Sequence, residues 1–152
     1  MDLKDGVKTA ENKVSQEAQQ LANLVRDRRK SMVDRLESYE DIINLEVGDT
    51  GLNRAKTLER EFNIRQLFIK YEGDNPTGTQ KDRIAFAQIY DALRREYHTV
   101  SLATCGNYGV AVALAANLAG IDCKIFIPES YHTDRIVEME TLGAEIIRMH
   151  GS

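Results

Sequence analysis

The sequence predicts an α/β fold with three layers and a mainly parallel sheet, preceded by an N-terminal helix. From residue 66, short apolar runs alternate with segments of helical periodicity, the pattern of right-handed βαβ crossovers. Residues 110–119 are apolar almost all round and rich in alanine, which is typical of a buried helix. Residues 1–38 are polar but carry a helical stripe of apolar side chains at Val14, Ala18, Leu21 and Val25.

These observations divide the chain into a helical N-terminal extension, residues 1–38, and an α/β domain, residues 39–152. With 152 residues, 42% of them hydrophobic, and a net charge of −4, the chain is large enough to bury a core. It has no apolar run near the length of a membrane span and no secretory signal pattern. We therefore expect a cytoplasmic protein without a membrane partner.

The charge pattern also argues against a nucleic-acid partner, because the chain is mildly acidic. A basic run at residues 26–30 contains an aspartate, and this favours a solvated helix face. The two cysteines, Cys105 and Cys123, lack metal-ligand spacing. We expect neither a metal site nor a disulfide.

The α/β domain is expected to alternate strands and helices in order. Its predicted strands are residues 67–71, 99–103, 124–127 and 146–149, and its predicted helices are residues 80–97, 110–119 and 133–142. Gly120 ends the second helix and Pro128 closes the third strand.

Lys81 is notable because it opens a predicted helix directly after a turn that contains Pro76 and Gly78. Thr79 followed three residues later by Asp82 resembles a capping box. Free N–H groups at this helix end favour a nearby anion, and partial burial would lower the pKa of the lysine, which helps an amine attack an aldehyde. Taken alone, a lysine in a first helical turn is more often solvated scaffold.

Residues 104–109, Thr-Cys-Gly-Asn-Tyr-Gly, join a predicted strand to the buried helix. Ligands of open α/β sheets collect at such carboxyl ends of strands. The simpler interpretation is a turn in which Gly106 and Gly109 serve backbone geometry alone. A Rossmann turn fits worse, since no Gly-x-Gly-x-x-Gly occurs. A helix N-terminus would activate the Cys105 thiol, but no histidine lies near it in sequence.

Three segments together resemble the fold type II pyridoxal-phosphate enzymes, the group of threonine synthase and cysteine synthase. Residues 75–83, Asn-Pro-Thr-Gly-Thr-Gln-Lys-Asp-Arg, resemble the Schiff-base lysine motif. Residues 104–109 resemble the asparagine loop, and residues 47–52 resemble the upstream Gly-Asn-Thr-Pro-Leu signal, with Gly51 in place of proline. The similarity runs from about residue 39 to the C-terminus.

This resemblance implies roles for individual residues. Lys81 would bind pyridoxal 5'-phosphate covalently and later move the substrate α-proton, while Asn107 would hydrogen-bond the ring hydroxyl of the cofactor. The substrate α-carboxylate would be received at the N-terminus of the buried helix by Thr104, Cys105, Gly106 and Tyr108.

The implied reaction is that of threonine synthase, which removes phosphate from O-phosphohomoserine and adds water. Cysteine synthase-like β-replacement is the alternative, and a noncatalytic module is a third possibility. The family's glycine-rich loop for the cofactor phosphate and its residue facing the pyridine nitrogen have no counterpart here. We therefore expect a fragment or N-terminal domain of an enzyme that acts on a small amino acid and is a homo-oligomer at full length.

Overall fold

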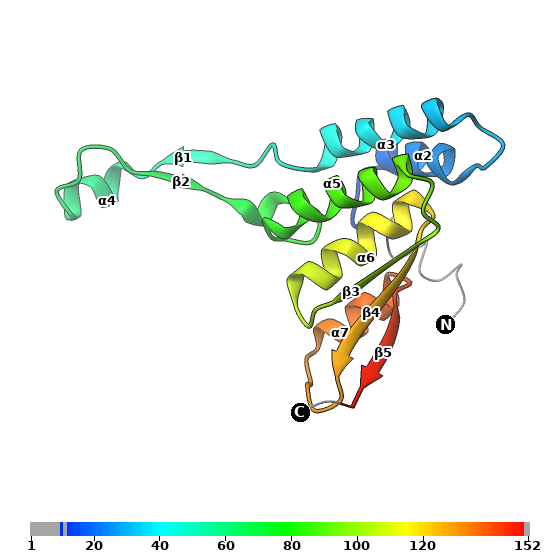
Figure 1. Ribbon diagram of the computed structural model, residues 1–152. Helices are drawn as coiled ribbons and strands as arrows, with labels where there is room; N and C mark the ends of the chain where they lie inside the picture. The colour runs from blue at the N-terminus through cyan, green and yellow to red at the C-terminus, as the bar shows by residue number, and fades with distance from the viewer. Residues whose placement is uncertain (1–9, 11, 151–152) are drawn as a thin grey trace.

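The computed structural model describes residues 10 and 12–150, which form a mixed α/β structure (Figure 1). Its main sheet is parallel, with the order β3 (Thr99–Ala103), β4 (Asp122–Pro128) and β5 (Glu145–Met149). Thr99 pairs with Asp122, and Lys124 pairs with Glu145. The helices α5 (Lys81–Arg94), α6 (Asn107–Ala119) and α7 (Arg135–Thr141) alternate with these strands. The predicted α/β class and parallel sheet are confirmed.

The N-terminal segment forms two helices, α2 (Gln16–Arg26) and α3 (Met32–Glu46), where the sequence predicted one. Side chains of Ser15 and Ser31 cap them by accepting hydrogen bonds from Ala18 N and Asp34 N. Helix α3 runs across residue 38, the predicted boundary of the extension. The first part of that extension, residues 1–9 and 11, lies outside the described residues.

A single core joins these helices to the α/β part. Tyr39 on α3 is fully buried, stacks on Phe86 of α5 with ring centroids 6.1 Å apart, and donates a hydrogen bond to Ala115 O of α6 at 3.1 Å. Helix α6 is buried on nearly all sides because α2, α5 and the sheet surround it. Gly120 ends it with a left-handed φ of 67°.

One predicted strand forms but lies outside the parallel sheet, which corrects the sequence interpretation. Strand β2 (Phe68–Lys70) pairs antiparallel with β1 (Leu52–Arg54), and this ribbon with α4 (Lys56–Glu61) projects from the body as an arm (Figure 1). Glu59 braces the tip of the arm by pairing with Arg54 at 2.8 Å and accepting from Leu67 N at 2.9 Å. A short apolar run indicates a strand but not its partner.

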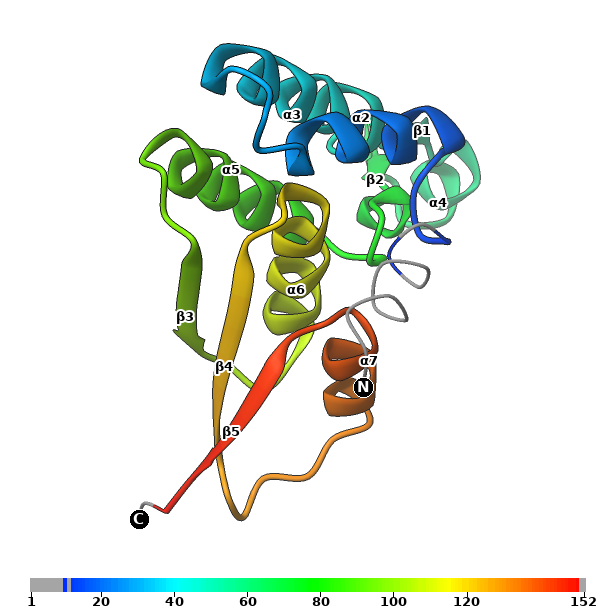
Figure 2. The same cartoon turned by 90° about the vertical axis from the view of Figure 1, so that its right-hand side faces the viewer.

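Within the described chain, α6 and α7 cover one face of the parallel sheet (Figure 2). Cys123, Ile125 and Ile127 of β4 point toward these helices and are buried, whereas Ser101 and Ala103 of β3 lie on the opposite face and are exposed. This alternation is what a strand covered on one face shows. A three-layer fold has helices on both faces of its sheet. The described residues do not supply the helices for the face that carries Ser101 and Ala103.

Candidate active site

The turn before α5 is fixed by a buried carboxylate next to Lys81. Asp82 is fully buried and accepts hydrogen bonds from Thr77 N at 3.1 Å and Thr77 Oγ1 at 2.9 Å. Burial raises the pKa of Asp82, although bonds from Thr77 and from the backbone of Thr79 act in the opposite direction. Thr79 Oγ1 accepts from Lys81 N at 3.2 Å. The predicted capping box therefore forms only in part: the Asp82 carboxylate is bonded to the backbone of Thr79 and to Thr77, but the Thr79 hydroxyl accepts from Lys81 N and α5 has no side-chain cap.

Lys81 itself is the first residue of α5, and its side chain is exposed. The partial burial expected for this lysine is therefore not found in the described chain. No hydrogen bond or ion pair involves its amine among residues 10 and 12–150. An amine with no competing partner fits a group that is to be linked covalently to an aldehyde.

Two of the three segments that carry the resemblance are tied together in space. Gly48 N donates to Asn75 Oδ1 at 3.0 Å, and Arg83 Nη2 donates to Gly48 O at 2.9 Å. Gly48 has a φ of 94°, in the region that favours glycine. Residues 47–52 therefore support the turn that precedes Lys81.

The third segment forms the turn from β3 into α6. No side chain caps α6, and its first turn contains no acidic residue. A Cβ at Gly106 would have no atom within 4 Å, whereas a Cβ at Gly109 would lie 2.7 Å from Met139 Cε and 2.9 Å from Thr104 Cγ2. Gly109 is thus required by packing, which supports the simpler interpretation for that residue. Gly106 instead faces open space, as a position that admits a ligand would.

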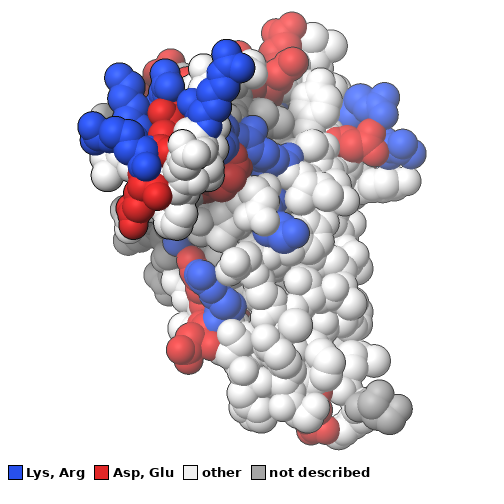
Figure 3. Space-filling model, turned by 90° about the vertical axis from the view of Figure 1, so that its left-hand side faces the viewer, with Lys and Arg blue, Asp and Glu red and all other residues white. Residues whose placement is uncertain are grey.

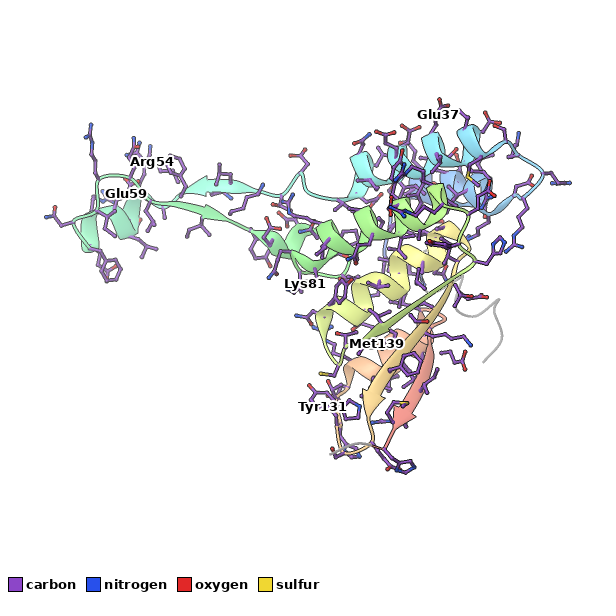
Figure 4. All side chains as sticks on the ribbon, viewed as in Figure 1. Glu37, Arg54, Glu59, Lys81, Tyr131 and Met139 are labelled. Carbon is purple, nitrogen blue, oxygen red and sulfur yellow. The ribbon has the colours of Figure 1, made fainter. Side chains whose placement is uncertain are left out.

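Helices α5 and α6 pack side by side with their N-termini at the same end, so Lys81 and Asn107 open neighbouring helices (Figures 1 and 4). Asn107 is exposed, and its amide has no hydrogen-bond partner in the described part of the chain. Charged side chains gather over the projecting arm, and the face below it is largely uncharged (Figure 3). Two helix N-termini on such a face favour an anion.

The other residues predicted to contact the substrate differ in whether their side chains are free to bind a ligand. The phenol of Tyr108 is already engaged, because it hydrogen-bonds to Gln88 of α5. Thr104, Cys105 and Gly106 are half-buried in the turn. Arg83, which follows the lysine motif, is also engaged, because it pairs with Glu72.

Tyr131 is a further candidate site residue, which sequence reasoning did not single out (Figure 4). It follows the carboxyl end of β4, the strand beside β3, and its side-chain hydrogen bond with Cys105 raises the pKa of its phenol. The sequence could have indicated this residue, because it follows Pro128, which closes a predicted strand, and ligands collect at the carboxyl ends of strands. Cys123, the other cysteine, is buried in β4, and this burial raises the pKa of its thiol to about 12.

The described residues contain no group of three or more His, Cys, Asp or Glu side chains arranged to hold a metal ion. None of the helices described here combines the length and the apolar character that a membrane crossing requires.

Residues 43–152 match the protein family described as pyridoxal-phosphate dependent enzyme. Cystathionine beta-synthase of Apis mellifera is 36% identical over 107 residues, 67% of this chain and 21% of the relative. Cysteine synthase B of Salmonella typhimurium is 34% identical over 105 residues, 66% of this chain and 34% of the relative. Threonine synthase of Methanocaldococcus jannaschii is 31% identical over 112 residues, 73% of this chain and 28% of the relative.

Solved structures show the same similarity. A pyridoxal 5'-phosphate-dependent aspartate racemase superposes with a TM-score of 0.66 at 29% identity, covering 78% of this chain and 38% of that one. Cysteine synthase from Entamoeba histolytica superposes with a TM-score of 0.61 at 26% identity, and the match covers 69% of this chain and 33% of that one. The chain therefore spans about a fifth to a third of the length of the curated relatives named above.

Proposed function

This chain belongs to the pyridoxal-phosphate-dependent enzyme family, and from that membership we propose that it supplies the lysine-bearing part of the active site of a lyase or synthase acting on a small amino acid. The observation that carries the proposal is the pair of neighbouring helix N-termini, one opened by Lys81 and the other by Asn107, whose side chains have no hydrogen-bond partner among residues 10 and 12–150.

In this proposal the Lys81 amine holds the cofactor and, once released, takes the proton from the substrate α-carbon. When bound, pyridoxal phosphate supplies an electron sink beside the substrate amine. Asn107 orients the ring through its amide. Thr104 and Cys105, with the open space in front of Gly106, receive the α-carboxylate at the start of α6.

Two reactions fit this arrangement. The first is the threonine synthase-like reaction, phosphate removal from O-phosphohomoserine followed by addition of water, and the resemblance of residues 75–78 to that group supports it. The second is β-replacement, as in cysteine synthases. Relatives named cystathionine beta-synthase and cysteine synthase B are 36% and 34% identical, against 31% for threonine synthase, and this favours the second.

Covalent trapping tests the cofactor role. The purified chain is incubated with pyridoxal 5'-phosphate, reduced with borohydride and mapped by mass spectrometry. We expect the pyridoxyl group on Lys81 in preference to Lys70, an exposed lysine whose amine already donates to Thr50 O at 2.6 Å. The proposal is contradicted if the pyridoxyl label is spread uniformly over the lysines, or if the Lys81→Arg variant is labelled as strongly as the original chain.

A paired assay separates the reactions. The protein is supplied with O-phosphohomoserine in one assay, and with a serine ester plus sulfide in the other. Phosphate release supports the threonine synthase-like reaction, and sulfur incorporation supports β-replacement. If neither occurs although Lys81 is labelled, the noncatalytic module is the better description of this chain.

A further inference from the structure

A pocket lies at the end of α5 opposite Lys81. It has a volume of about 270 Å³ and is formed by the α2–α3 turn, the start of α3, the end of α5 and the link from α5 to β3. Over the length of α5 a helix rise of 1.5 Å per residue separates it from Lys81 by roughly 20 Å. Its lining residues are Arg28, Lys30, Met32, Arg35, Leu93, Glu96, Tyr97 and His98.

The pocket concentrates positive charge in an acidic chain. Three cations and a single carboxylate line it, whereas the whole chain has a net charge of −4. The basic residues of the run 26–30 have different surroundings in the structure. Arg29 pairs with Asp27 at 2.8 Å, and Arg26 donates to Asn117 O at 3.0 Å. Arg28 and Lys30 are the members of the run that line the pocket.

The cations of the pocket are available to a ligand. The Arg28 and Lys30 side chains have no hydrogen bond or ion pair within the described residues. Arg35 donates from Nε to Val25 O at 2.6 Å, which holds its guanidinium in place and leaves the Nη groups to bind. Other arginines are neutralised by carboxylates, as Arg54 is by Glu59.

The other wall is apolar and is positioned by the end of α5. Glu96 has a left-handed φ of 59° and donates from its backbone N to Leu93 O at 3.0 Å, as in a helix C-terminal cap. This turn, closed by Tyr97 N donating to Ala92 O at 3.0 Å, places Tyr97 in the pocket wall beside Met32 and Leu93. Such a wall suits the apolar or aromatic body of a small ligand.

We propose that this pocket binds a phosphate monoester with an apolar or aromatic body. Arginine supplies a planar fork of donors and lysine a point charge, the combination that recognises phosphate oxygens. The ligand would thus occupy a site apart from the one that holds Lys81, and this proposal does not depend on the function proposed above.

Amide NMR of the purified chain tests this with phenyl phosphate as the probe and inorganic phosphate for comparison. We expect saturable shifts at residues 28–35 and 93–98 with a Kd below about 1 mM, and weaker binding of inorganic phosphate. Arg28→Glu/Lys30→Glu should weaken binding at least about tenfold, because two charge-assisted contacts are lost. Arg28→Gln/Lys30→Gln, which adds no repulsion, should weaken it as well.

The matched control is Arg60→Glu/Arg65→Glu, which changes the net charge equally at two exposed arginines of the arm. Distant charges are screened, so this variant should bind within about twofold of the original chain. An equal loss in the control overturns the proposal, as does the absence of saturable shifts. Shifts confined to residues around Lys81 and Asn107 also overturn it, because the phosphate would then occupy the candidate active site.

Discussion

Arg83 donates hydrogen bonds to both carboxylate oxygens of Glu72, from Nε to Oε2 at 2.8 Å and from Nη2 to Oε1 at 2.9 Å. The same Nη2 donates to Gly48 O at 2.9 Å. A planar, bidentate ion pair of this kind fixes the orientation of the two side chains as well as the distance between them. The upstream segment and the turn before Lys81 are thereby held in one arrangement.

This pair predicts an acid-sensitive part of the stability. Arg83 lowers the pKa of Glu72 from 4.5 to about 2. A depressed folded-state pKa gives stability that is present above pH 4.5 and is lost as the pH falls toward about 2. Glu72→Gln should therefore flatten the dependence of the free energy of unfolding on pH in this window. Denaturant unfolding at several pH values measures it.

Asp91→Asn is the control for the bracing role of the Glu72–Arg83 pair. Asp91 pairs with Arg94 and Arg95 on the exposed side of α5 but connects no separate segments. We expect its variant to leave the amide signals of Gly48 and Lys81 unchanged, whereas Glu72→Gln should shift them. Identical spectral effects of the two variants would contradict the bracing role.

Gly109 and Gly106 should respond oppositely to alanine. In Gly109→Ala the new Cβ would meet Met139 Cε at 2.7 Å, and Met139 is fully buried. Overpacking of this kind costs about 1–3 kcal/mol, only partly offset by the gain in helix propensity of about 1 kcal/mol. Gly106→Ala meets no atom within 4 Å and should change stability by less than about 0.5 kcal/mol.

Thermal or denaturant unfolding of both glycine variants measures this difference. The labelling of Lys81 by pyridoxal 5'-phosphate provides the second measurement, since Gly106→Ala fills part of the space in front of the turn. If Gly106→Ala unfolds the chain while Gly109→Ala is neutral, the assignment of structural and ligand-facing glycines is reversed.

Asn107 is predicted to matter for activity but not for folding. In an active enzyme that contains this domain, Asn107→Ala should lower turnover by about tenfold to a thousandfold, as the loss of one preorganised polar contact commonly does. Pyridoxyl labelling of Lys81 should persist, and the unfolding curve should be unchanged because Asn107 is exposed. A normal rate in this variant would reduce residues 104–109 to a structural turn.

Tyr39→Phe tests whether α3 shares the core of the α/β part. The phenol donates to Ala115 O at 3.1 Å in a fully buried position. Its removal should cost about 1 kcal/mol and lower the stability in one cooperative transition. A separate early transition for α2 and α3 would show that the N-terminal helices fold independently. Leu45→Ala, at an exposed position on α3, is the control.

The sequence predicted local features well where periodicity and turn chemistry act over a few residues. The strand at residues 99–103, the buried helix that follows and the start of α5 at Lys81 were all anticipated within a few positions. The break at residues 27–31 contains Arg28, a charged residue after the apolar stripe, but the sequence did not show that two capped helices flank it.

Pairing across long distances was decided only by the tertiary structure. Residues 67–71 have the composition of a strand, yet their partner is β1 rather than the parallel sheet. The bonds of Arg83 to Glu72 and of Tyr131 to Cys105 likewise join segments that local pattern cannot relate. The sequence by itself placed Lys81 at the start of a helix and Asn107 in the turn before the buried helix, because helix propensity and turn chemistry are local. Packing of α5 on α6 brought these two N-termini together, because burial is a property of the whole chain.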